Sequence, residues 1–286
     1  MSRRWIVRPA LLSDRLAVAQ LMNRATVLHR HLDWREPIEW LDQTPFLVLE
    51  ADHLLHAALA CPPDPPKIAW LRLFACDDTI PTEDAWSLLW EKAKAILDYT
   101  SVSTAAAIAL NDSLPPLLER SHFSSDQEII LLEFEQFQPI ETSLDPEWTI
   151  RPMKIHDLPD VASLDANAFE PLWQTSLEMF RWAFRLSTYA TVAEQNGTIL
   201  GYQLSMRSVF SVHLARLAVL PEKQGQGIGL ALTLDMMKRA QESGLYRFTV
   251  NTQNDNTASL KLYKRLGFRE TGERYPVYRY SFAAKE

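Results

Sequence analysis

The pattern of apolar and polar positions in the second half of the chain predicts strands that alternate with helices. Period-two or continuous apolar runs favour strands, and they cover residues 148–151, 189–194, 199–207, 214–220, 245–250 and 275–280. Asn196-Gly197, between the second and third of these runs, is typical of a type I′ hairpin turn. Helical spacing of apolar residues follows at 158–168 and from Ile228 onward. Together these elements indicate an α/β fold class.

The same succession of elements occurs twice along the chain. Trp5-Ile6-Val7-Arg8-Pro9 is echoed by Trp148-Thr149-Ile150-Arg151-Pro152, at an offset of 143 residues, and each leads into an apolar helix that follows an acidic residue. Such an internal repeat predicts two copies of one α/β unit. We place the domains at residues 1–143 and 144–286, with the join near the polar, proline-flanked stretch 138–146.

A glycine-rich loop separates the predicted strand 214–220 from the helix that follows. It reads Gln224-Gly225-Gln226-Gly227-Ile228-Gly229. Each glycine in the first turns of a helix costs about 1 kcal/mol relative to alanine, so three of them indicate that bare backbone is needed there. Backbone N–H groups at a helix N-terminus form a ready site for phosphate groups. The loop is neither a Walker loop nor a G-x-G-x-x-G fingerprint. A glycine-rich turn that binds nothing is the alternative interpretation.

A second motif lies downstream, from Asn254 to Phe268. Asn256 is a good helix N-cap and Gly267 is a good C′ residue in the left-handed conformation, which predicts a helix of about ten residues between them. Ser259 and Tyr263 are four positions apart and therefore share one face of this helix.

The two motifs resemble the acyl-CoA signatures of the GNAT superfamily of N-acetyltransferases, Q/R-x-x-G-x-G/A and N-x-x-A-x-x-L-Y-x-x-x-G-F. The resemblance implies two tandem GNAT-like domains, each a mostly antiparallel mixed sheet that contains a splayed parallel pair of strands and is flanked by helices. The layout is similar to that of mycothiol synthases, from which we carry over the architecture only. The implied activity is transfer of an acetyl group from acetyl-CoA to a primary amine of a small molecule or peptide, directly in a ternary complex. The alternatives are a non-catalytic acyl-CoA-binding or regulatory protein, and an acyltransferase that uses a different acyl-CoA.

The resemblance also implies a set of site residues. Tyr263 would protonate the departing thiolate, which its ordinary pKa of about 10 suits, and the alternative is a structural tyrosine. His213 is the candidate general base near neutral pH, although a hydrogen-bonded strand histidine, with an ordered water as the base, fits equally well. The loop from Phe169 to Trp173 would admit the acceptor, its aromatic side chains otherwise belonging to the core. The positions expected to bind the cofactor are Leu217, Ala218, Val219, Gln224, Gly225, Gln226, Gly227, Ile228, Gly229, Asn256 and Ser259.

The first copy lacks the features of both motifs. All 8 glycines of the chain lie beyond residue 196, and residues 77–84, where the glycine loop would fall, read Asp-Asp-Thr-Ile-Pro-Thr-Glu-Asp. Four carboxylates at this place would repel a diphosphate, and no tyrosine stands near Arg120, at the counterpart of Tyr263. We therefore expect residues 1–143 to be a degenerate, non-catalytic GNAT-like domain and residues 144–286 to be the catalytic one.

Composition and charge narrow the class of protein further. Of the 286 residues, 47% are hydrophobic and 23% are charged, as in globular proteins generally. The net charge of −7 divides into −10 over residues 1–146 and +3 over residues 147–286, so the half with the glycine loop suits an anionic cofactor. We expect no signal peptide, no membrane span and no nucleic-acid partner. Two cysteines without metal spacing favour a cytoplasmic protein with no metal site. The acceptor amine and the oligomeric state are open.

Overall fold

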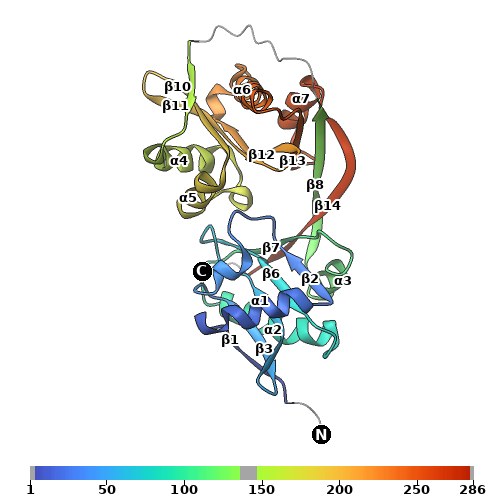
Figure 1. Cartoon of the computed structure of the whole chain (residues 1–286). Coiled ribbons are helices and arrows are strands. Elements are labelled where there is room, and N and C mark those ends of the chain that lie inside the picture. Colours follow the sequence, from blue (N-terminus) through green and yellow to red (C-terminus); the bar gives the residue numbers. More distant parts are fainter. Residues whose placement is uncertain (1–3, 136–146, 284–286) are drawn as a thin grey trace. The chain divides into compact units, whose positions relative to one another are not determined.

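The computed structural model describes residues 4–135 and 147–283 and divides into two compact units. Unit 1 comprises Met1–Gln127 with Tyr275–Glu286, and unit 2 comprises Glu128–Arg274. Each unit combines helices with mostly antiparallel strands and one parallel pair of strands, which confirms the predicted α/β fold class (Figure 1). The predicted join at 138–146 lies outside the described residues.

Unit 1 contains a five-stranded sheet of order β1-β3-β4-β6-β2, in which neighbouring strands are antiparallel. Its strands are β1 (Ile6–Pro9), β2 (Val27–Arg30), β3 (Phe46–Ala51), β4 (Leu54–Ala60) and β6 (Leu73–Cys76). Unit 1 also contains a parallel pair of strands outside this sheet, β5 (Ile68–Trp70) and β7 (Thr104–Ile108). The helices are α1 (Arg15–Arg24), α2 (Thr82–Leu97) and α3 (Pro115–Arg120). The core of the unit forms where α2 packs Trp86 edge to face on Phe74 of β6, at 5.1 Å.

Unit 2 is built on strands in the order β8-β13-β12-β11-β10-β9. They are β8 (Ser124–Glu135), β9 (Thr149–Pro152), β10 (Tyr189–Gln195), β11 (Thr198–Arg207), β12 (Ser211–Val219) and β13 (Arg247–Gln253). The helices are α4 (Leu158–Ala168), α5 (Leu177–Leu186), α6 (Ile228–Glu242) and α7 (Thr257–Arg265). Asn196 and Gly197 have φ of 50° and 81° between β10 and β11, so the predicted type I′ turn is confirmed.

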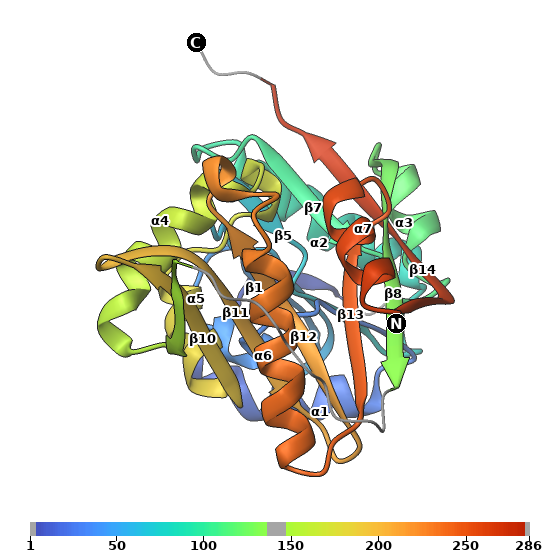
Figure 2. The ribbon, with the colours of Figure 1, turned by 90° about the horizontal axis from the view of Figure 1, so that it is seen from above.

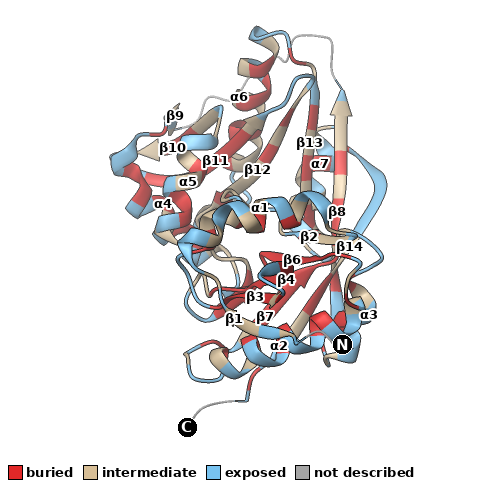
Figure 3. Ribbon diagram, turned by 60° about the horizontal axis from the view of Figure 1, so that its bottom comes forward, coloured by how far each residue is buried: buried red, intermediate tan, exposed pale blue. Residues whose placement is uncertain are grey.

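Helices cover both faces of the unit 2 sheet. Leu217 packs on Ile228 and Leu232 of α6, whereas Arg216 binds Asp165 of α4. Because successive side chains of a strand point to opposite faces, α6 and α4 lie on opposite sides of β12. Figures 1 and 2 show α7 on the same side as α6, and Figure 3 shows buried residues along the strands between these layers. None of the helices that the described residues form is both long and apolar enough to cross a membrane.

Each unit takes its last strand from the other half of the chain. β8 follows α3 in sequence, yet its residues 129–135 pair with β13. β14 (Arg269–Ser281) follows α7, yet its residues 277–281 pair with β7. The compact units therefore differ from the contiguous domains 1–143 and 144–286 that the repeat suggested. Hydrophobic periodicity identifies a strand but not its partner, and equivalent strands of a repeat carry the same periodicity.

Candidate active site

Part of β12 has no strand partner on one edge among the described residues. Its parallel ladder with β13 covers only Ser211 to Leu214. On the opposite edge, β11 pairs with β12 as far as Val219, with a bulge at Ala215 because Leu204 pairs with Arg216 and Ser205 with Leu214. The parallel pair therefore splays apart beyond Leu214, which confirms the predicted splay.

The backbone of Leu217 and Val219 faces this open edge. The N–H of Leu220 donates to the carbonyl of Leu200 in β11, at 2.9 Å. Since successive residues of an antiparallel strand direct their N–H and C=O groups to alternate edges, those of Leu217 and Val219 point away from β11. The Nε2 of Gln224 accordingly donates to the carbonyl of Val219 at 3.2 Å. An extended chain that carries amides can add to such an edge as an extra strand does.

The glycine loop between β12 and α6 has the left-handed backbone that glycine favours. Gly225 and Gly227 have φ of 77° and 87°, and Gly227 is the N-cap of α6. A side chain at either position would meet no heavy atom within 4 Å, so the backbone conformation, rather than crowding, requires glycine. No side chain caps the first turn of α6. The backbone N–H groups of this turn are therefore not bound by a capping side chain and can donate to a ligand.

The second motif forms the predicted helix α7. The Oδ1 of Asn256 accepts a hydrogen bond from the backbone N–H of Ser259 at 3.1 Å, so Asn256 is the N-cap. Gly267 has φ of 93° just beyond the helix. Both of these predictions are confirmed.

A cavity of about 510 Å³ is lined by residues of both motifs. Its walls include ten of the eleven residues predicted to bind the cofactor: Leu217, Ala218, Val219, Gln224, Gly225, Gly227, Ile228, Gly229, Asn256 and Ser259. The eleventh, Gln226, is exposed and donates its Nε2 to the carbonyl of Glu222 at 3.3 Å. The motif itself does not indicate in which direction the side chain of Gln226 points.

Several cavity residues were not predicted to bind the cofactor: Ala168, Phe169, Lys223, Leu230, Ala258, Lys261, Leu262 and Arg265. Those on α7 are spaced three and four apart and so share one face of the helix. Once Asn256 and Ser259 are placed in the site, this helical spacing would have predicted them. Of the residues that line the cavity, three are cationic, Lys223, Lys261 and Arg265, and none is acidic. This charge favours an anionic ligand.

Tyr263 lies behind the cavity wall rather than in it. Its side chain is 4% exposed, and its ring packs on Phe268 with the centroids 5.6 Å apart. Burial raises the pKa of the Tyr263 hydroxyl above its usual value, so the group is neutral and protonated through the physiological range. The adjacent residue Leu262 does line the cavity.

His213 lies on β12 before the splay and is not part of the cavity wall. Its Nδ1 is 2.9 Å from the Oγ1 of Thr249 on β13. Burial lowers the pKa of His213 below 6.5, against an opposing hydrogen bond with Asn251. The imidazole is therefore neutral at pH 7 and able to accept a proton.

The equivalent edge in unit 1 is occupied by a strand of the chain itself. Ile68 pairs with Thr104 just as Ser211 pairs with Arg247, at the repeat offset of 143, so β5–β7 is the counterpart of β12–β13. β6 continues the course of β5 and pairs with β4 on one edge and with β2 on the other. β2 thus fills the edge that in unit 2 has no strand among the described residues.

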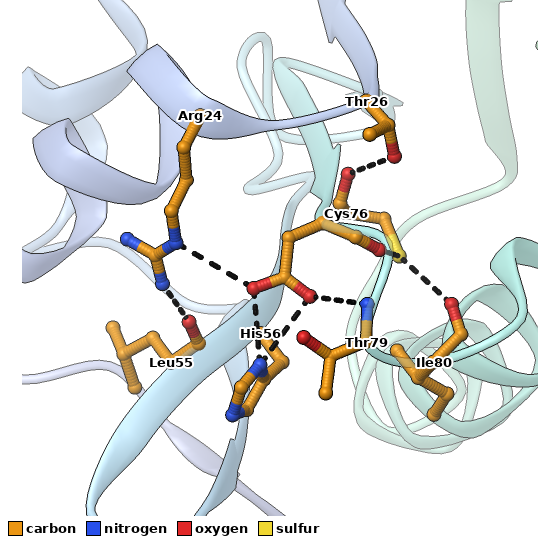
Figure 4. A network of polar contacts seen from close by, with 8 residues as sticks. Arg24, Thr26, Leu55, His56, Cys76, Thr79 and Ile80 are labelled. Carbon is orange, nitrogen blue, oxygen red and sulfur yellow. Dashed lines mark hydrogen bonds and ion pairs between the residues drawn. The ribbon is translucent and has the colours of Figure 1, made fainter.

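The loop that follows β6 is closed by a carboxylate. Asp77 accepts a hydrogen bond from the backbone N–H of Thr79 at 3.0 Å, and its oxygens lie 3.0 Å from His56 Nδ1 and 3.5 Å from Arg24 Nε (Figure 4). Although burial opposes it, these hydrogen bonds hold the pKa of Asp77 below its usual value. The loop therefore binds its own anion at the place where unit 2 has its glycines. Within residues 4–135 and 147–283, no group of three or more His, Cys, Asp or Glu is arranged to hold a metal ion.

Comparison with known proteins assigns unit 2 to a family. The model of the acetyltransferase (GNAT) family matches residues 155–268. An uncharacterized N-acetyltransferase of Methanocaldococcus jannaschii is 30% identical over 129 residues, which cover 42% of this chain and 78% of that protein. The mycothiol acetyltransferase of Pseudarthrobacter chlorophenolicus is 50% identical over 50 residues, which cover 18% of this chain and only 16% of that enzyme.

A solved structure is similar over almost the whole chain. The tandem GNAT protein from the clavulanic acid biosynthesis pathway matches with a TM-score of 0.68 and 13% identity, covering 99% of this chain and 100% of that one. At this identity the likeness concerns the fold, and it confirms the tandem architecture. Taken with the family match and with the N-acetyltransferase that is similar in sequence, these findings show that the chain belongs to the GNAT family.

Proposed function

We propose that this chain transfers an acetyl group from acetyl-CoA to a primary amine of a small molecule or peptide, in unit 2 and within a ternary complex. The observation that carries the proposal is the open edge of β12 beside a cavity whose walls come from both motifs. Lined by three cations and no acidic residue, the cavity suits the phosphates of this donor, and the open edge suits its amides.

Each part of the donor has a counterpart in the site. The uncapped N–H groups of the α6 N-terminus would hold the diphosphate, with Lys223 and Lys261 as nearby cations. The backbone of Leu217 and Val219 would pair with the pantetheine amides. A backbone N–H at Val219 would donate to the thioester oxygen, and a donor of this kind is worth a few kcal/mol in the transition state.

Two proton transfers complete the chemistry. The amine nitrogen attacks the thioester carbon, the C–S bond breaks, and the Tyr263 hydroxyl, which lies behind the cavity wall, gives its proton to the departing sulfur through an ordered water. The amine loses one proton to His213, relayed by ordered water because His213 is not in the cavity wall. That proton returns to Tyr263 through solvent, so the products are an amide and the free thiol of CoA.

His213→Gln should change the pH dependence of kcat/KM if His213 is the base. The wild-type value should fall as the pH drops through the pKa of His213, which lies below 6.5, because only the neutral ring accepts a proton. The variant should lose this acid limb together with about tenfold or more of its rate at pH 7.5. Thr249→Val, which removes only the partner of Nδ1, is the matched control. If the acid limb survived in His213→Gln, His213 would not be the base, and water alone would accept the proton of the amine.

Unit 1 should bind no acyl-CoA, because β2 occupies the edge of β6 and Asp77 occupies the loop. Isothermal titration of the full chain with CoA should therefore give one site per chain. Asp77→Asn should leave this stoichiometry unchanged, since β2 still fills the edge. Two sites of similar affinity would contradict the assignment of catalysis to unit 2 alone.

The burial of Tyr263 behind the cavity wall favours a second candidate, a non-catalytic acyl-CoA-binding protein. Incubation of the full chain with radiolabelled acetyl-CoA and a panel of primary amines separates the two candidates. Labelled amide in any reaction would support the transferase, whereas tight CoA binding with no labelled product would support the binder. An acyltransferase that uses a different acyl-CoA is the other alternative. The cytoplasmic location stays a prediction.

A further inference from the structure

The cavity of unit 2 reaches both faces of the sheet. Most of its walls come from β12, α6 and α7, and α6 and α7 lie on one face. Ala168 and Phe169 also line it, and they belong to the end of α4, which packs on the opposite face of β12 (Figure 1). The cavity therefore passes through the sheet where β12 and β13 splay apart, and Phe169 lines it on the α4 side.

The ring of Phe169 rests on a guanidinium group. The Cζ of Arg216 lies 4.3 Å from the centroid of the Phe169 ring, a cation–π distance. Arg216 immediately precedes Leu217 on the open stretch of β12. The wall that Phe169 forms is thus tied to the same strand segment that would hold the acyl donor.

Arg216 is itself held by a buried carboxylate. Asp165 of α4 has no exposed surface and accepts from Arg216 Nε at 2.6 Å and from Nη2 at 2.8 Å. It also accepts from the Tyr202 hydroxyl and from the backbone N–H of Thr175. The two parallel N–H···O bonds of such a bidentate pair fix the orientation of the guanidinium group. The pair stays formed because the loss of either partner would leave an uncompensated buried charge.

The loop that carries Phe169 is held by one further bond to Arg216 and by two bonds from Gln174. Arg216 Nη2 donates to the carbonyl of Trp173 at 2.6 Å. The Nε2 of Gln174 donates to the carbonyls of Ala166, at 2.9 Å, and Phe169, at 3.1 Å. Residues 169–175 are therefore held in place by these bonds, and Phe169 among them lines the cavity.

We propose that Phe169 limits the length of the acyl chain that the cavity accepts, and that Arg216, oriented by Asp165, is the residue that positions it. The inference rests on the proposed function, because it takes the donor to enter with its phosphates at α6 and its acyl group toward α4. A chain longer than acetyl would then meet a ring that Arg216 contacts at 4.3 Å.

Phe169→Ala should shift the acyl preference of the full chain toward longer donors. Each methylene moved into an apolar space improves affinity about fourfold, so butyryl-CoA, with two more methylenes, should gain about 16-fold in affinity relative to acetyl-CoA by titration calorimetry. Phe169→Leu, a smaller change to the wall, should give an intermediate shift. Phe210→Ala is the matched control, because Phe210 is 80% exposed and lies outside the cavity wall.

The outcomes separate this inference from the proposed function. A wild-type chain that binds no CoA would overturn both. Wild-type binding of CoA, with a butyryl-to-acetyl ratio that both Phe169 variants leave within twofold of the wild-type ratio, would overturn this inference alone.

Arg216→Lys tests the positioning role. Lysine keeps a charge beside Asp165 but has no planar group for the Phe169 ring and cannot bind both Asp165 and Trp173 in the same fork. The variant should show the same shift toward butyryl-CoA while its Kd for free CoA changes less than twofold. An equal loss of affinity for CoA and for every acyl-CoA would show a purely structural role and overturn the assignment.

Discussion

Replacing Tyr263 by phenylalanine should lower kcat roughly 100- to 1000-fold and leave the KM for acetyl-CoA nearly unchanged. The substitution removes one hydroxyl that acts only as the C–S bond breaks, and general acid catalysis by a positioned group is typically worth this much. Steady-state rates at saturating donor and acceptor measure the effect. Because burial raises the pKa of Tyr263 above its usual value, the wild-type hydroxyl should stay protonated, and kcat should show no loss from this group up to about pH 9.

Tyr189→Phe is the matched control for this prediction. It deletes one hydroxyl in the same unit, where the group donates to the Ser243 hydroxyl at 3.3 Å. Its kcat should stay within twofold of the wild-type value. If Tyr263→Phe did the same, solvent would be the proton donor and Tyr263 would be a packing residue.

Replacing Gly227 by valine should weaken CoA binding by roughly 10- to 100-fold. A side chain there projects from a cavity wall at the α6 N-terminus, where the diphosphate is expected, and a hydrogen bond to a charged group contributes about 1.5–3 kcal/mol. Titration calorimetry with CoA measures the loss directly, without any acceptor.

Gly244→Val separates strain from ligand binding. Gly244 follows the other end of α6, with φ of 77°, and a Cβ at this position would meet no heavy atom within 4 Å, so its backbone penalty matches that of Gly227. Both variants should lose similar amounts of thermal stability, but only Gly227→Val should lose affinity. Equal Kd values for the two variants would show that the diphosphate of CoA does not bind at this loop.

Much of unit 2 was predictable because its signals are local. The hairpin at Asn196-Gly197, the N-cap at Asn256 and the left-handed glycines each depend on the conformational preference of one or two residues. The two motifs also converge on one cavity, since both begin where a strand meets a helix N-terminus. The direction of the Gln226 side chain was beyond this kind of inference, because alternation within an irregular loop has no fixed period.

Unit 1 shows where local signals run out. The acidic residues from Asp77 onward predicted the loss of a phosphate site, and the structure adds that Asp77 binds a backbone N–H of its own loop. Nothing in residues 27–30 indicates that they fill the edge of β6, because a short strand pattern is compatible with any open edge.

The amino-acid sequence by itself determined the repeat, the fold class and the glycine and asparagine positions of the two motifs, since these follow from periodicity and backbone preference. Only the tertiary structure decided which strands pair, and so that the halves exchange β8 and β14 and that β2 closes the edge in unit 1. It also brought Arg216 to Asp165, 51 positions away. Strand partners and buried ion pairs depend on distances between remote segments, which no local pattern encodes.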